Sequence, residues 1–301
     1  MQLAETLDQA AGLRRLLGEQ ESFHALGVFS PDNTLNASAS ASLAYALARR
    51  GSPVCVLDAL PLPRNVAGCL GIPENPGLGD LARRRLPLAE ALADAGANLC
   101  LIEARQGVTR VAATDEHAWR EWGAGVEDLG LEWLILTADE SNDASLALSS
   151  TLRLLVLPAA RNRLPEAYAT LKAAHQRQPD GHWRVLVMDT ASEQDARELM
   201  ASLADTARRF LGIALDYAGS IPRDAHIEQA ARALRPLLDL APESPAAQAF
   251  RGLAETLPGW CEGQPALAAG LFWQRLGMFA RLAQPALARA RTRARHEPAH
   301  G

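Results

Sequence analysis

The chain has 301 residues, of which 48% are hydrophobic, and its net charge is −5 at neutral pH. Such a length supports one large α/β domain with appendages or two small domains, and the acidic balance argues against a general nucleic-acid binder. No apolar run approaches the ~20 residues that a membrane-spanning helix needs, and the N-terminus lacks the basic region and apolar core of a signal peptide. We therefore expect a cytoplasmic protein.

The first predicted element is an amphipathic helix over residues 3–17. Its apolar side chains recur at helical spacing and are Leu3, Leu7, Ala10, Leu13 and Leu17. Gly18 predicts the end of this helix, and a polar linker follows it. We therefore expect three parts: an N-terminal helix over 1–20, a core domain over 21–260 and a C-terminal segment over 261–301.

Within the core domain, short apolar strands alternate with amphipathic helices. The strands are predicted at residues 25–29, 54–57, 98–102, 133–136, 154–157, 184–188 and 215–220. The helices are predicted at residues 37–49, 78–84, 88–95, 115–129, 164–176, 193–210, 225–234 and 244–257. This alternation predicts an α/β fold with a doubly wound, mostly parallel sheet that helices cover on both faces.

The first core strand leads through an eight-residue loop into a helix, which is the frame of a phosphate-binding P-loop. The loop, Ser30–Ala37, contains no glycine, so its backbone cannot easily wrap a phosphate. It also contains no lysine, and the only lysine of the chain is Lys172. These residues do not favour ATP hydrolysis of the P-loop type.

No metal site is predicted, because the four cysteines and seven histidines show no CxxC, HExxH or paired spacing. Asp58 and Asp139 at strand ends could be remnants of a metal site, but turn or helix-cap residues are commoner there.

The last predicted element is a helix over residues 266–283, followed by an arginine-rich tail. Phe272, Leu276 and Phe279 belong to its broad apolar face. Two interpretations stay open: the helix docks on the domain core, or it lies on an anionic membrane surface with the tail arginines behind it.

Four segments carry a resemblance to a known family. Asp8–Arg14 reads DQAAGLR and fits a DQAxxLR motif ahead of the first core strand; the other three are 54–71, 165–172 and 210–257. Together they resemble the MinD/ParA-like ATPases, and within them the FlhG/FleN group of flagellar-number regulators. The resemblance covers most of the chain and implies a P-loop fold of the SIMIBI type.

The resemblance also implies a degenerate nucleotide site. The family contacts phosphate, magnesium, water and adenine through positions that correspond here to Pro31, Asn36, Ala37, Asp58, Leu60, Thr137 and Met188. Only Asp58 keeps the family's residue type. Phosphoryl transfer depends on positioned positive charge and metal. We therefore expect a pseudo-ATPase with no catalytic residue and no cofactor, which is not an enzyme and is monomeric because ATP does not close a dimer.

For partners, the resemblance implies that the N-terminal helix binds the flagellar GTPase of the signal-recognition-particle class, FlhF, and stimulates its GTP hydrolysis. The residues of this contact would be Asp8, Gln9, Ala10, Leu13 and Arg14, with Gln9 reaching toward the nucleotide. One alternative is a scaffold that represses the flagellar master transcription factor or binds basal-body proteins; another is an atypical nucleotide-binding ATPase. The expected location is the cytoplasm, with peripheral attachment at the inner membrane or cell pole.

Overall fold

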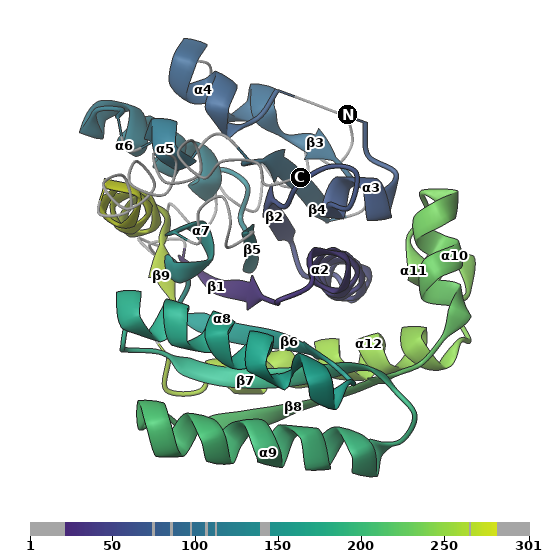
Figure 1. The fold of residues 1–301 in the computed structure, drawn as a ribbon. Helices are drawn as coiled ribbons and strands as arrows, with labels where there is room; N and C mark the ends of the chain where they lie inside the picture. The colour runs from purple at the N-terminus through teal and green to yellow at the C-terminus, as the bar shows by residue number, and fades with distance from the viewer. Residues whose placement is uncertain are drawn as a thin grey trace, which may run out of the picture.

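The computed structural model describes residues 22–73, 76–84, 87–96, 98–105, 108–111, 113–138, 145–264 and 266–281. Its centre is a twisted sheet in the strand order β3-β4-β2-β5-β1-β6-β7-β8, with β9 paired to β1 outside this path (Figure 1). The strands are β1 Ser22–Phe29, β2 Val54–Ala59, β3 Ala93–Asp94, β4 Leu99–Glu103, β5 Trp133–Ala138, β6 Leu152–Pro158, β7 His182–Thr190, β8 Leu215–Pro222 and β9 Leu267–Ala268.

Helices connect the strands and cover both faces of the sheet (Figure 1). The α-helices are α2 Asn33–Arg49, α3 Val66–Leu70, α4 Leu78–Arg84, α5 Val108–Val111, α6 Glu116–Glu127, α7 Ser145–Leu148, α8 Leu164–Arg177, α9 Glu193–Leu211, α10 Ala225–Ala233, α11 Leu237–Leu240 and α12 Pro245–Thr256. Residues 269–281 are also helical. Short 3₁₀ turns are Leu88–Ala91, Arg161–Arg163 and Leu257–Cys261. The expected doubly wound, mostly parallel α/β sheet is confirmed.

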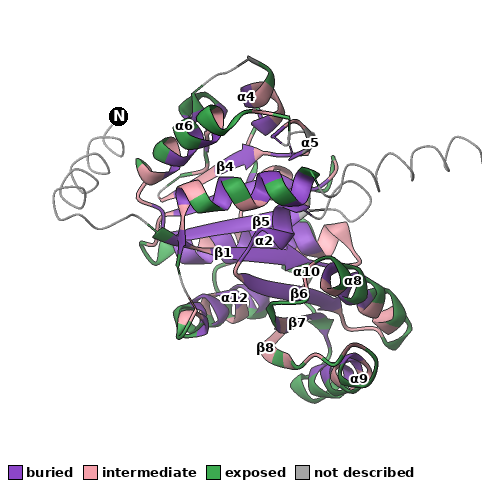
Figure 2. Cartoon of the chain, turned by 90° about the vertical axis from the view of Figure 1, so that its left-hand side faces the viewer, coloured by how far each residue is buried: buried purple, intermediate pink, exposed green. Residues whose placement is uncertain are grey.

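Alternation along β1 explains why the sheet has two cores. Phe23, Ala25 and Phe29 belong to one buried cluster, and Leu26 and Val28 belong to the other. Successive side chains of a strand point to opposite faces, so a strand buried on both sides reads as a continuous apolar run. The central strands are accordingly buried, while helices such as α8 and α9 expose their outer faces (Figure 2).

Two short antiparallel strands lie where helices were predicted: β3 falls within the helix predicted over 88–95, of which only 88–91 form a 3₁₀ turn, and β9 falls at the start of the helix predicted over 266–283. β3 pairs with β4 at one edge of the sheet, and β9 pairs with the first residues of β1. Each is only two residues long, so neither has a period that a sequence pattern could reveal. The β1–β9 pair has a consequence for the chain ends, because Ser22 lies opposite Ala268 and Phe23 opposite Leu267.

The C-terminal helix 269–281 is part of the core, and the boundary expected near residue 260 does not separate it from the sheet. Phe272, Trp273 and Leu276 are fully buried, and Phe279 is 8% exposed. The interpretation of Phe272, Leu276 and Phe279 as a membrane-facing surface therefore does not agree with the structure, which favours docking on the domain. No helix among the described residues has the length and apolar character needed to span a membrane.

Glycines explain why helix 269–281 sits so close to α6. A Cβ added to Gly123 of α6 would lie 3.3 Å from the Cα atom of Gly270, and one added to Gly277 would lie 2.4 Å from the ring of Trp119. Bulkier residues would hold the two helices apart. Gly270 and Gly277 weaken an isolated helix, but here Gly123 and Gly277 allow it to pack against its neighbour.

Candidate functional site

The candidate site lies where β1, β2 and β5 end and α2 begins. In doubly wound sheets, ligands bind at the carboxyl ends of the strands. β1 ends at Phe29, Ser30 and Pro31 turn the chain, and α2 starts at Asn33. β2 and β5 run beside each other to the same edge, with Asp58 opposite Thr137 in the register.

Asp32 caps the helix that would face a phosphate. Its Oδ1 accepts hydrogen bonds from the backbone N–H groups of Thr34 at 2.9 Å and Leu35 at 3.2 Å. A helix N-terminus attracts anions through its free N–H groups and its dipole. Here a carboxylate of the chain itself takes that place, held in position by the hydroxyl of Ser30, which accepts from the Asp32 N–H at 3.1 Å.

The buried side chain of Asn36 links the start of α2 to β1. It is fully buried, its side-chain amide donates to the carbonyl of Val28 at 3.2 Å, and its Oδ1 accepts from the Ser40 hydroxyl at 3.1 Å. The neighbouring Ala37 is 1% exposed. The residues that the resemblance aligns with the P-loop lysine and the magnesium ligand thus hold the start of α2 against β1.

Asp58 is the most heavily hydrogen-bonded side chain of the site. It is 1% exposed and accepts from the N–H groups of Leu60, Val66 and Ala67 and from the hydroxyl of Thr137. Burial raises the pKa of this carboxyl, and the four hydrogen bonds oppose the rise. Asp58 therefore ties the β2–α3 connection to β5.

Two arginines bring positive charge to the loop. Arg163, after β6, donates from Nη2 to the carbonyl of Pro31 at 3.4 Å and lies 3.8 Å from Asp32 Oδ2. Arg64, after β2, donates to the Thr34 hydroxyl at 3.2 Å. Sequence reasoning missed both, although arginines that follow two strands of one sheet edge were a usable signal. The single lysine, Lys172, is exposed on α8.

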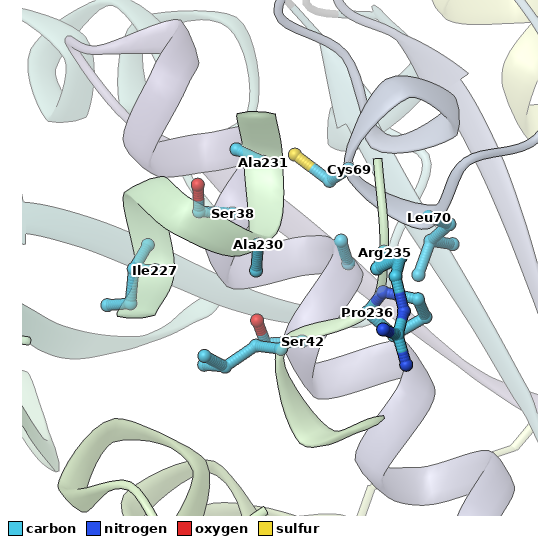
Figure 3. A pocket seen from close by; sticks show the side chains of 11 residues that line it. Ser38, Ser42, Cys69, Leu70, Ile227, Ala230, Ala231, Arg235 and Pro236 are labelled. Atoms are coloured by element: carbon cyan, nitrogen blue, oxygen red, sulfur yellow. The ribbon is translucent and has the colours of Figure 1, made fainter. Parts of the chain in front are cut away.

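A small cavity lies behind α2, between it and the α3 and α10 helices (Figure 3). Ser38, Ser42, Cys69, Ala230 and Arg235 contribute to its wall, and its volume of about 20 Å³ is room for about one water molecule. Burial and the charge of Asp58 raise the pKa of the Cys69 thiol to about 11, against a hydrogen bond with Ser38. The thiol therefore stays protonated at neutral pH.

The remaining predicted residues are dispersed. Leu60 and Met188 are fully buried in the second hydrophobic cluster, so the structure gives them packing roles. Among the described residues, no group of His, Cys, Asp or Glu could hold a metal ion. Asp139 lies outside the described residues, as do all the predicted partner-binding residues: Asp8, Gln9, Ala10, Leu13 and Arg14.

Solved structures with the same fold include cell-division proteins and a ParA family ATPase. The chain superposes on MinD of Aquifex aeolicus with a TM-score of 0.61 and 19% identity, covering 78% of this chain and 97% of that one. For a ParA family ATPase from Chlorobium tepidum TLS, the TM-score is 0.60 with 16% identity and coverage of 79% and 99%. For MinD of Pyrococcus horikoshii OT3 complexed with Mg-ADP, the values are 0.60, 18%, 81% and 99%. The fold is therefore that of the MinD/ParA ATPases.

Sequence comparison shows a narrower similarity. The chain is 27% identical to the antiactivator FleN of Pseudomonas aeruginosa over 226 residues. This aligned stretch covers 73% of the chain and 81% of FleN. No family model matches the chain. The similarity to FleN, together with the MinD/ParA fold, confirms the resemblance to the FlhG/FleN group inferred from the motifs.

The expectation that the chain is not an enzyme is contradicted by the same comparisons. The structures that share its fold include a ParA family ATPase and a MinD complexed with Mg-ADP. The expectation drew on the missing lysine of the loop and on the other replaced positions of the nucleotide site, and it did not include Arg64 and Arg163, which lie beside that loop.

Proposed function

We propose that the chain regulates flagellar number and placement by binding protein partners. The observation that carries this proposal is the similarity to the antiactivator FleN over 73% of the chain. The DQAxxLR motif at Asp8–Arg14, ahead of β1, adds a specific contact surface. The partner that the motif suggests is the flagellar GTPase FlhF.

The position of β1 supports a role for this motif in partner binding. Ser22, the first described residue, is exposed and begins a strand whose first residues pair with β9. The chain therefore enters the described domain at its surface, at Ser22. Leu3, Leu7, Leu13 and Leu17 would supply apolar contact area to the GTPase, and Gln9, at the flank of that face, has the chemistry to orient an attacking water.

A peptide of residues 1–20 tests the proposal with purified FlhF. It should bind and raise GTP turnover. Gln9→Ala should lose most of the stimulation but little of the affinity, because affinity alone does not accelerate chemistry. Gln20→Ala, outside the motif, is the matched control and should behave as the wild type. Equal turnover with wild-type and Gln9→Ala peptides at saturation would remove the role of Gln9, and no binding by the wild-type peptide would remove this partner.

The name of the relative supports a second candidate. FleN is an antiactivator, so the core domain could itself bind the flagellar master transcription factor. Pull-downs with the full chain carrying Leu7→Gln and Leu13→Gln separate the two candidates. These changes should abolish capture of the GTPase and leave capture of the transcription factor unchanged if both activities exist.

A further inference from the structure

Helix 269–281 exposes two apolar side chains, Leu271 and Met278, on the side that faces solvent, where Gln274 and Arg281 are exposed as well. Phe272, Trp273 and Leu276 are fully buried, yet Leu271 and Met278 are each 50% exposed. Residues seven apart share one face of an α-helix, so Leu271 and Met278 form one outer patch.

The β1–β9 pair shows which part of the chain is within reach of this patch. Ser22 lies opposite Ala268, and helix 269–281 begins at the next residue. Residues 1–21 therefore leave the domain beside the start of that helix. No long connection is needed to bring the N-terminal segment onto its outer face.

Length and composition of the N-terminal segment fit the patch. A helix over residues 3–17 would be about 22 Å long and the 269–281 helix about 20 Å. In a helix that runs back from residue 22, Leu17 and Ala10 are seven residues apart, and so are Leu271 and Met278. Residues 1–21 carry four acidic and two basic side chains, and Arg281 is exposed one turn after Met278.

We infer that residues 3–17 dock, as an antiparallel helix, on the outer patch formed by Leu271 and Met278. The docked helix would bury the apolar face Leu3, Leu7, Ala10, Leu13 and Leu17 inside its own chain. The importance of this contact depends on the proposed function, because that face is also the one assigned to the GTPase. Docking would make the full chain a weaker activator than the free peptide until the partner displaces the helix.

Hydrogen exchange in the full-length protein tests the contact from the N-terminal side. The amides of residues 3–17 should exchange about tenfold or more slowly than in the free peptide 1–20, as expected for a docked element. The double variant Leu271→Gln, Met278→Gln keeps good helix formers at exposed positions and should raise exchange to the rate of the peptide. Phe210→Gln, at an exposed hydrophobic residue of α9, is the control and should leave the protection unchanged.

Oxidation of Met278 by hydrogen peroxide tests the contact from the other side. One oxygen atom passes from the peroxide to the sulfur, water is released, and peptide mapping gives the rate. Met188 and Met200 are buried, so Met278 is the accessible methionine of the described chain. In the full-length variant Leu7→Gln, Leu13→Gln, oxidation of Met278 should be several-fold faster than in the wild type.

Free exchange of residues 3–17 in the wild type would overturn the inference. So would protection of Met278 that the Leu7 and Leu13 changes leave intact, since another occupant would then cover the patch. That occupant would be a second copy if the protection rises with protein concentration, a lipid surface if it requires anionic vesicles, and residues 282–301 otherwise. Neither readout uses the GTPase, so a peptide that fails to stimulate it refutes the proposed function and leaves this contact standing.

Discussion

The hydroxyl of Thr137 on β5 donates a 2.9 Å hydrogen bond to the carboxylate of Asp58 on β2 and accepts one from the N–H of Ala59 at 3.2 Å. Both side chains are buried. One hydroxyl thus satisfies a buried carboxylate and a buried backbone donor at once, and it fixes the ends of two strands at the candidate site. The resemblance aligned Thr137 with a magnesium-linked aspartate and Asp58 with an acidic position of the nucleotide site, whereas here the two side chains form a hydrogen bond that links two strands.

We expect Thr137→Val to lower the free energy of unfolding by about 1–3 kcal/mol, because it leaves a buried donor and a buried acceptor each one partner short. Thr137→Ser keeps the hydroxyl and should cost about 1 kcal/mol for the lost methyl group. Urea unfolding of the three proteins is the measurement. A valine variant as stable as the serine variant would show that the bond has no net stabilising effect.

Asp32→Ala removes the cap of α2 and should destabilise the protein by about 0.5–2 kcal/mol. Asp32→Asn retains an oxygen for the N–H groups of Thr34 and Leu35 and loses only the partly exposed ion pair with Arg163, which is worth about 0–1 kcal/mol. Thermal unfolding should therefore rank the wild type and the asparagine variant close together and the alanine variant clearly below both. Equal losses in the asparagine and alanine variants would mean that charge, and not capping, is what Asp32 contributes.

Much of the fold could be predicted because the signals are local. The β1–loop–α2–β2 frame and most later elements follow from apolar periodicity, which burial on one or two faces produces. β3 and β9 could not be predicted because they are too short to show a period. For helix 269–281, composition could not say which apolar side chains face the core: Phe272 and Leu276 do, whereas Leu271 and Met278 do not.

At the site, the sequence identified positions but not their partners. Asp58 and Thr137 are far apart in the chain, and only the parallel register of β2 and β5 brings them together. Arg163 reaches Pro31 because β6, which precedes it, pairs with β1, and no local pattern predicts that pairing. The resemblance located the loop. It did not predict that the Asp32 carboxylate accepts hydrogen bonds from the first N–H groups of α2, where a phosphate would otherwise bind.

Gly277→Ala should destabilise the protein by about 1–3 kcal/mol, because the added methyl group overlaps the ring of Trp119 and overpacks the contact with α6. Gly270→Ala is the matched control in the same helix, since its Cβ would meet no atom within 4 Å. That change should be neutral or stabilise by up to about 1 kcal/mol through helix propensity. Calorimetry of both variants checks the difference, and equal effects would contradict core docking of this helix.

Asn36→Lys should destabilise the fold by about 3 kcal/mol or more, because it places an ammonium group in a fully buried position that now holds an amide with two partners. Asn36→Met, of similar length without charge, separates the cost of size from the cost of charge. Chemical denaturation should show the methionine variant as clearly the more stable of the two. If both variants lose the same stability, the position rejects length alone.

The final prediction concerns pH and Asp224, which caps α10 and reaches α12. Its Oδ1 accepts from the N–H of His226 at 2.9 Å and its Oδ2 from the N–H of Ala246 at 3.0 Å. Burial alone would raise the pKa of this carboxyl, but its hydrogen bonds, including those with the His226 and Ser244 side chains, lower it to about 2. A folded-state pKa below the unfolded value means that the carboxylate stabilises the fold above about pH 4 and that this contribution is lost as the pH falls toward about 2.

Asp224→Asn should therefore reduce the free energy of unfolding at about pH 7 by about 1–2 kcal/mol, because an amide can accept for only one of the two backbone donors without turning its NH₂ group toward the other. The gap in stability between the wild type and this variant should be constant from about pH 7 to pH 5 and then shrink through about pH 3, as the wild-type carboxyl takes up a proton. Urea titrations of both proteins across that range measure the gap. A gap that stays constant down to about pH 3 would place the stabilising charge elsewhere in the contact between α10 and α12.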